Sequence, residues 1–212
     1  MKIRWYGHAS FLFTSKDGIK VLTDPFDSSV GYPIPEVEPN IVTISHEHFD
    51  HNAVNTLKGK FTVLKGKVEK EVSGIIIKSI SSYHDDALGS KRGENYIFKF
   101  LIDEINIVHL GDLGHILTKE DKEKIGEIDI ICIPVGGIYT IDAKQALDII
   151  EKFNPKIAIP MHYKTPHLKF DLAPVDTFIS LVKYPVKRLA EKEIEITKEV
   201  LPISTEIWVL PY

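Results

Sequence analysis

The sequence has a single cysteine and no long apolar run, and each absence narrows the class of protein. Cys132 has no second cysteine with which to form an internal disulfide, so nothing indicates an oxidising compartment. Its surroundings, IDIICIPV, predict a buried strand and a buried thiol. The N-terminal MKIRWYGHAS lacks the apolar core of a signal peptide. No apolar run approaches the ~20 residues of a membrane helix. We therefore expect a cytoplasmic protein with no membrane partner.

The chain also lacks an excess of basic residues. Its 26 Lys and Arg against 30 Asp and Glu give a net charge of −4, which disfavours a nucleic-acid partner. No GxSxG elbow and no phosphate-cradling glycine-rich loop is present, so serine-hydrolase and nucleotide-binding chemistry have no support. A small-molecule substrate is the expectation that remains, and the oligomeric state stays open.

The order of apolar and polar segments predicts an α/β protein, or α+β in some schemes, with layered sheets. Its 212 residues, 43% of them hydrophobic, suit one domain spanning 1–212. The N-terminal segment predicts two strands, 3–15 and 19–24, joined by a KDG turn. Further strands are expected at 40–45, 61–65, 74–80, 95–102, 105–110, 128–135, 156–161, 193–197 and 206–210. Helices are expected at 53–57, 118–125, 142–153 and 174–182, with caps at Thr118 and Asp142.

Residues 46–51, HEHFDH, concentrate three histidines and two acids directly after a predicted strand. In an extended segment, residues two apart point the same way, so His46 and His48 can present imidazoles to one point. Asp50 and His51 are adjacent and diverge unless the chain turns, which would aim them at a second point nearby. This layout predicts two metal ions about 3.5–4 Å apart that share a hydroxide. Glu47 and Phe49, between these residues, are expected to face away.

Two such ions need about three more protein ligands, with positions left open for water. His84, Asp112 and His162 each follow a predicted strand, where α/β proteins commonly place functional groups. Asp112 lies between glycines in HLGDLG, so backbone can approach it closely, and it is the best candidate for a bridging carboxylate. Imidazole and carboxylate ligands together suit Zn, Fe and Mn.

These motifs resemble the metallo-β-lactamase superfamily. HEHFDH matches its HxHxDH signature, and TDPF at 23–26 is similar to its first motif. The likeness runs from Tyr6 to His162 and on through the terminal strands. GHASF, HLGDLGH, PVGGIYTID and IPMHYKTP look like a bacterial and archaeal subgroup of metal-dependent hydrolases near the L-ascorbate-6-phosphate lactonases. The chain is shorter than those lactonases, which weakens a transfer of their substrate.

The resemblance implies a four-layer αβ/βα sandwich, the metallo-β-lactamase/oxidoreductase fold, with a site at one edge of two facing sheets. It implies a first divalent ion bound by His46, His48 and His84, and a second bound by Asp50, His51 and His162. Asp112 would bridge the two ions, and Asp24 would orient a ligand histidine. Zinc is the first expectation, with manganese or iron as alternatives.

The resulting prediction is a binuclear, zinc-dependent hydrolase whose metal-bridging hydroxide cleaves a lactone, ester or phosphoester. Asp50 and Asp112 are predicted to act in catalysis, and either His115 or a tyrosine at the rim of the pocket to steady the developing oxyanion. The alternatives are a metal-dependent nuclease or phosphodiesterase, an iron redox protein, and a non-catalytic metal-binding protein on the same fold.

The remaining histidines and two tyrosines divide between the site and the rest of the protein. His8, Tyr139 and Tyr163 are predicted to lie in or beside the pocket. His109 is predicted to be a core residue or a neighbour of the ligands, because it shares a strand face with two isoleucines. His167 is expected to be exposed.

Overall fold

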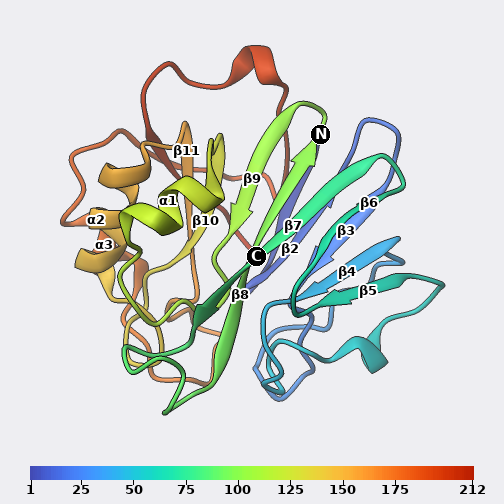
Figure 1. The fold of residues 1–212 in the computed structure, drawn as a ribbon, viewed down its shortest axis with the longest axis horizontal. Coiled ribbons are helices and arrows are strands. Elements are labelled where there is room, and N and C mark those ends of the chain that lie inside the picture. Colours follow the sequence, from blue (N-terminus) through green and yellow to red (C-terminus); the bar gives the residue numbers. More distant parts are fainter.

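Two mixed β-sheets face each other in the computed structural model, which describes residues 1–212 (Figure 1). The six-stranded sheet has the order β13-β1-β2-β3-β4-β5. Its strands β1 to β3 are antiparallel, whereas β3, β4 and β5 run parallel. The bounds are β1 Lys2–Gly7, β2 Ser10–Thr14, β3 Lys20–Thr23, β4 Ile41–Ile44, β5 Thr62–Lys65 and β13 Glu193–Glu195.

The eight-stranded sheet has the order β12-β14-β11-β10-β9-β8-β7-β6. Strands β10 and β11 are apolar and buried along their whole length, as is typical of central parallel strands covered on both faces. The hairpin strands β7 and β8 alternate between buried and partly exposed residues. The bounds are β6 Glu69–Val72, β7 Ile75–Tyr83, β8 Glu94–Ile102, β9 Ile105–His109, β10 Ile130–Pro134, β11 Ile157–Met161, β12 Val186–Arg188 and β14 Glu206–Val209.

The three α-helices gather beside the eight-stranded sheet (Figure 1). They are α1 Lys119–Ile125, α2 Ala143–Phe153 and α3 Val175–Ile179. The predicted caps are confirmed, since Thr118 with Asp121 and Asp142 with Gln145 form reciprocal capping boxes. Between β3 and β5 the only helix is the short 3-10 turn η1, Val54–Thr56; a second, η2, spans Lys198–Val200. No helix combines the length and the hydropathy of a bilayer-crossing segment.

The first predicted strand, 3–15, is wrong: it is two strands with a tight reversal between them. Gly7 has φ 104° and His8 has φ 52°, both in the left-handed region, and the chain turns back on itself there. Strand β2 then pairs antiparallel with β1. The reversal leaves His8 at a strand end instead of inside a strand.

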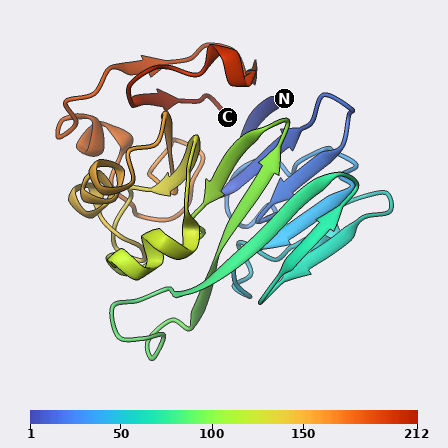
Figure 2. The ribbon, with the colours of Figure 1, turned by 45° about the horizontal axis from the view of Figure 1, so that its top comes forward.

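The last part of the chain joins the two sheets. Strand β13 pairs with β1 of the six-stranded sheet, whereas β12 and β14 belong to the eight-stranded sheet. Figure 2 shows this segment crossing one end of the molecule. The Met1 backbone amine donates a hydrogen bond to the Ile196 carbonyl at 2.9 Å.

Aromatic side chains meet across the space between the sheets. Phe13 on β2 and Phe100 on β8 are fully buried, with ring centroids 5.8 Å apart. Phe11 on β2 contacts His109 on β9 at 5.9 Å. The core therefore holds the two sheets, and so the ends of their strands, in a fixed relation.

We expect Phe100→Ala to lower the free energy of unfolding by about 3–5 kcal/mol, because it leaves a cavity between the sheets. Chemical denaturation would measure the loss. Ile76→Ala is the control on the adjacent strand, since Ile76 is 49% exposed, and its cost should stay below about 1 kcal/mol. Equal losses for the two variants would contradict this account of the core.

Candidate metal centre

The predicted ligands follow the ends of four strands drawn from both sheets. Residues 46–51 follow β4 of the six-stranded sheet. His84, Asp112 and His162 follow β7, β9 and β11 of the eight-stranded sheet. The packing of the two sheets brings all these strand ends to one edge of the sandwich.

Four imidazoles converge on one carboxylate oxygen of Asp112, whose side chain is almost fully buried. The distances from Asp112 Oδ2 to Nε2 are 3.1 Å for His162, 3.3 Å for His51, 3.3 Å for His84 and 3.9 Å for His46. His48 lies beside them, with its ring centroid 4.5 Å from that of His46 and 5.1 Å from that of His84. The structure thus brings together side chains that lie as far apart in the sequence as His46 and His162, which are separated by 116 positions.

Three sets of side chains place their potential ligand atoms within 4.8 Å of one another. The sets are His46, His48 and His84; His46, His51 and Asp112; and His8, His51 and His162. The first is the set predicted for one ion. In the third, His8 stands where the prediction has Asp50. Asp50 lies close by, with its Oδ2 3.7 Å from His51 Nε2.

His8 is fully buried beneath the cluster, and its Nε2 donates a hydrogen bond to Asp50 Oδ2 at 3.1 Å. Its ring lies 4.3 Å from that of His162 and 4.8 Å from that of His51, measured between centroids. The prediction placed His8 in or beside the pocket. The structure places it behind Asp50, where it fixes the direction of that carboxylate.

The cluster has the donor set and the unsatisfied atoms that a metal centre requires. Buried polar atoms without a hydrogen-bond partner include Nε2 of His46 and of His51, Nδ1 of His84 and of His162, and Oδ1 of Asp112. Buried polar atoms are nearly always paired. This group of unpaired atoms in one place therefore requires an additional binding partner. Imidazole nitrogen and carboxylate oxygen are ligands that bind zinc. The residues therefore fit divalent metal, and their individual assignment as ligands stays a prediction.

Asp24, directly after β3, orients the cluster from behind. Its Oδ1 accepts the backbone N–H of Ser45 at 2.7 Å, and its Oδ2 accepts the Ser45 hydroxyl at 2.6 Å. The same Oδ2 accepts Nδ1–H of His51 at 3.0 Å. His51 therefore carries its proton on Nδ1, which leaves Nε2 free to face Asp112. This is the arrangement by which carboxylates fix the tautomer of metal-binding histidines.

Burial and neighbouring charges set the protonation of these groups. Burial lowers the pKa of His46 to about 3 and that of His8 to about 4, with neighbouring histidines adding to the effect. Both imidazoles are therefore neutral at pH 7, the form that binds metal. Burial would raise the pKa of Asp112, but His162 and His51 outweigh it and hold that pKa well below its ordinary value.

Two glycines beside Asp112 allow the close approach that the sequence predicts. A Cβ on Gly111 would lie 2.6 Å from the Ser45 Cβ, and one on Gly114 would lie 2.3 Å from the backbone of His84. The Asp112 backbone N–H donates to Asn95 Oδ1 at 3.0 Å. The loop after β9 thus lies in close contact with the two other segments that carry predicted ligands.

A cavity of about 380 Å³ opens onto the cluster. Five predicted ligands line it: His48, Asp50, His84, Asp112 and His162. Its other walls are Phe49, Arg92, Tyr139 and Phe170. Tyr139 lies at the pocket as predicted, whereas the expectation that Phe49 faces away is wrong. Glu47 does face away, toward Lys65 at 2.6 Å.

Arg92 and Phe170 were not among the predicted site residues. The only signal for Arg92 in the sequence is its place in the polar loop that begins at His84. Phe170 lies in the irregular segment after β11 and meets Phe49 edge-on, with ring centroids 6.3 Å apart. Such a contact between distant loops leaves no pattern in the sequence.

Two predicted site residues do not join the cluster. Tyr163 is buried against Trp5, with ring centroids 5.1 Å apart, because the left-handed turn at His162 sends the next side chain into the core. His115 is absent from the walls of the cavity, and its Nδ1–H donates to the Ile116 carbonyl at 3.1 Å. The geometry thus gives no support to a catalytic role for His115.

His109 is a core residue. Its Nε2–H donates to the Ala9 carbonyl at 2.8 Å, and its Nδ1 accepts the backbone N–H of Gly111 at 3.2 Å. Both ring nitrogens are therefore occupied within the protein, and His109 has no free atom for a metal. It ties the two sheets together just behind the cluster.

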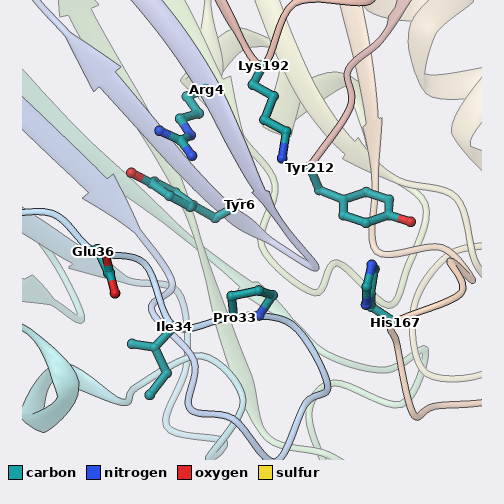
Figure 3. Close-up of a pocket in the computed structure, with 8 residues that line it drawn as sticks. All are labelled: Arg4, Tyr6, Pro33, Ile34, Glu36, His167, Lys192 and Tyr212. Atoms are coloured by element: carbon teal, nitrogen blue, oxygen red, sulfur yellow. The ribbon is translucent and has the colours of Figure 1, made fainter.

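A second cavity, of about 500 Å³, lies between β1, the 33–36 segment and the C-terminus (Figure 3). Arg4 and Lys192 lie on one side of it, with the Arg4 guanidinium 4.6 Å from the centre of the Tyr6 ring, and the exposed His167 lies on the other. It contains none of the predicted ligands and no buried titratable group. The chemistry of the molecule therefore belongs to the smaller cavity.

Comparison with known proteins agrees with this geometry. Residues 2–162 match the family described as the beta-lactamase superfamily domain. A UPF0173 metal-dependent hydrolase of Thermoplasma acidophilum is 33% identical over 207 residues, which cover 83% of this chain and 87% of that protein. The chain belongs to the UPF0173 metal-dependent hydrolases of the metallo-β-lactamase superfamily. It is thus a metal-dependent hydrolase, as the sequence predicted.

Solved structures confirm the predicted fold class. A Thermotoga maritima protein described as a candidate zinc-dependent hydrolase of this superfamily is 38% identical, with a TM-score of 0.80 and 99% of each chain covered. The diiron β-hydroxylase CmlA of Streptomyces venezuelae is 14% identical, with a TM-score of 0.59 over 76% of this chain and 44% of that one. At that identity the second likeness concerns the fold alone.

We expect Asp24→Asn to weaken divalent metal binding by about 10–100-fold, because His51 loses the carboxylate that fixes its tautomer. Zinc titration calorimetry and the metal content of the purified protein would measure the change. Asp27→Asn is the matched control, since the Asp27 carboxylate is hydrogen-bonded to Ser29 and to none of the cluster residues. Unchanged zinc affinity in Asp24→Asn would contradict the role given to Asp24.

Proposed function

We propose that the protein is a binuclear, zinc-dependent hydrolase that cleaves a small lactone, ester or phosphoester. The observation that supports the proposal most is the convergence of four imidazoles on the buried Asp112 carboxylate. The first ion would be held by His46, His48 and His84, and the second by His51 and His162 together with Asp50. Asp112 would be shared between them.

The bound ions would lower the pKa of a coordinated water and polarise the oxygen of the bond to be cleaved. The protein's own residues would position the reactants. Asp50 faces the cavity with 13% of its side chain exposed, and His8 holds its Oδ2. Held in this way, the Asp50 carboxylate would orient the attacking water beside the second ion. Phe49 and Phe170 limit the access of bulk solvent on one side of the cavity.

A cavity of about 380 Å³ is at the small end of the range for small-molecule sites, roughly 300–1,000 Å³. This size supports a small substrate over a polymer. The likeness of GHASF, HLGDLGH and IPMHYKTP to the subgroup near the ascorbate phosphate lactonases supports a lactone or other carboxylic ester as the first class to test. A phosphoester is the second class.

The alternative functions differ in what they require of the site. A nuclease needs cations along a strand-binding surface, but Arg92 is the only Lys or Arg among the walls of the cavity. An iron redox protein could use the same ligands, and the fold carries a diiron enzyme in CmlA. Metal analysis with an absorption spectrum, and cleavage assays on RNA and DNA with and without EDTA, would separate these functions from hydrolysis of small esters.

We expect Asp112→Ala to remove at least one metal ion and all hydrolytic activity on a panel of lactones, esters and phosphodiesters. The variant deletes the one carboxylate that four imidazoles face. Metal content and turnover with Zn, Mn and Fe would be measured together. Asp86→Ala, an exposed acid paired with Lys91, is the control and should retain both properties. A full metal complement in Asp112→Ala would contradict the assignment of Asp112 as a metal ligand.

We also expect EDTA to lower the thermal midpoint of unfolding and added zinc to restore it. A ligand that binds only the folded state stabilises it by about 2.7 kcal/mol at a free concentration 100 times its Kd. Differential scanning fluorimetry with and without zinc would measure the shift. The shift should shrink in Asp112→Ala. An EDTA-insensitive midpoint, in protein shown to lose its metal, would contradict a metal-linked fold.

A further inference from the structure

The loop that follows His84 is wound around the carboxylate of Asp85. Asp85 Oδ1 accepts the backbone N–H groups of Ala87 and Gly89 at 2.8 and 2.9 Å, and Oδ2 accepts those of Lys91 and Arg92 at 2.9 and 2.7 Å. The carboxylate is almost fully buried within this loop. The loop is therefore a preformed structure in which the position of Arg92 is set relative to the predicted ligand His84.

The Arg92 side chain extends from this loop to the wall of the 380 Å³ cavity. Its guanidinium lies 5.6 Å from the centre of the Tyr139 ring, and Nη2 donates to the Ile138 carbonyl at a long 3.4 Å. No carboxylate lies within ion-pair distance of it. Its neighbour Lys91, in contrast, is paired with Asp86 at 2.7 Å. Arg92 therefore has most of its five donors free beside the cavity.

The segment that faces Arg92 across the rim is itself in an unusual conformation. Ile138 has φ 61°, a left-handed value that a β-branched residue rarely adopts. Ile138 and Tyr139 are 61% and 42% exposed, so burial does not force this shape. Strained backbone of this kind is concentrated at functional sites. Here the strain presents a carbonyl and an aromatic face to the guanidinium, and both restrict its orientation.

We infer that Arg92 binds an anionic group, a phosphate or a carboxylate, at the end of the substrate away from the bond that is cleaved. The inference rests on the proposed function, because it takes the reacting end to lie at the predicted metal ligands. A guanidinium fork matches the oxygens of either anion with two parallel hydrogen bonds. Phe49, Tyr139 and Phe170 would line the carbon skeleton between the two ends.

The test compares ligands that differ only at the far end. Gluconolactone ends in a hydroxyl, its phosphorylated form in a phosphate, and glucarolactone in a carboxylate. Turnover of the three lactones by the zinc-loaded protein gives kcat and KM. Calorimetric titration with the hydrolysed acids gluconate, phosphogluconate and glucarate measures binding without any turnover. Comparison of the affinities for phosphogluconate and glucarate shows whether the site prefers a phosphate or a carboxylate.

Arg92→Gln removes the charge, and Arg92→Lys keeps the charge but removes the fork. All three acids share the carboxylate that hydrolysis creates, and we expect the wild-type protein to bind phosphogluconate or glucarate, which carry a second anionic group at the far end, more tightly than gluconate. Arg92→Gln should weaken that binding, and raise KM for the matching lactone, by about 10–100-fold, the range for hydrogen bonds to charged groups. Gluconate binding, kcat and zinc content should stay the same. The affinity of Arg92→Lys should lie between those of the wild type and Arg92→Gln. Lys91→Gln should bind like the wild type, since Lys91 belongs to the same loop but is paired with Asp86.

Three results would overturn the inference: no preference of the wild type for phosphogluconate or glucarate over gluconate, equal affinities in wild type and Arg92→Gln, or an equal loss of gluconate and zinc binding in that variant. The last result would mean that Arg92 only supports the loop. Arg92-dependent binding of an anionic acid without turnover of any ester would leave the anion site standing and reject the hydrolase proposal. Ester turnover that is the same in wild type and Arg92→Gln would support the hydrolase proposal and reject the anion site.

Discussion

The buried carboxylate of Asp112 is the group on which the rest of the candidate site depends. Four imidazoles face one of its oxygens, and the other oxygen has no partner. Burying so many polar atoms is costly unless each is paired. Burial keeps His46 neutral, so that imidazole cannot balance the charge of the carboxylate. Burial would also lower the pKa of His51, but Asp112, Asp24 and Asp50 outweigh it and raise that pKa well above its ordinary value, so His51 can carry part of the compensating charge. Divalent cations would complete the balance. The composition of the cluster thus follows from the electrostatics of a single buried charge.

The same cluster also links the two halves of the sandwich. His46 and His51 come from the six-stranded sheet, whereas His84, Asp112 and His162 come from the eight-stranded sheet. A metal held by both groups would act as a cross-link between the sheets. His8, Asp24 and His162 all have positive φ, at 52°, 39° and 51°, and such residues cost of order 1–3 kcal/mol each. The large core between the sheets must offset this strain, which explains why the site is built on the ends of well-packed strands.

Much of this could be predicted from the sequence, because the residues of the cluster obey local rules. HEHFDH has a fixed spacing, and His84, Asp112 and His162 follow apolar strands whose ends meet at one edge. Tyr163 could not be placed this way, since the left-handed turn at His162 breaks the alternation of side chains that a strand would show. The walls of the cavity escaped prediction for a different reason: contacts such as that of Phe49 with Phe170 depend on the paths of loops, which no periodic pattern encodes.

In the 84–92 loop, the residue that belongs to the candidate metal centre and the residue proposed to select the substrate are different. His84 belongs to the cluster, and Asp85, the next residue, organises the loop that carries Arg92 to the rim. Because Asp85 holds the loop through its backbone N–H groups, the side chains at its rim can change without disturbing the position of His84. One loop would then carry both a residue of the candidate metal centre and a residue that contacts the substrate. Loops on rigid frames commonly carry binding residues, and the identity of the substrate is therefore to be sought in Arg92 and the aromatic walls, not in the histidines.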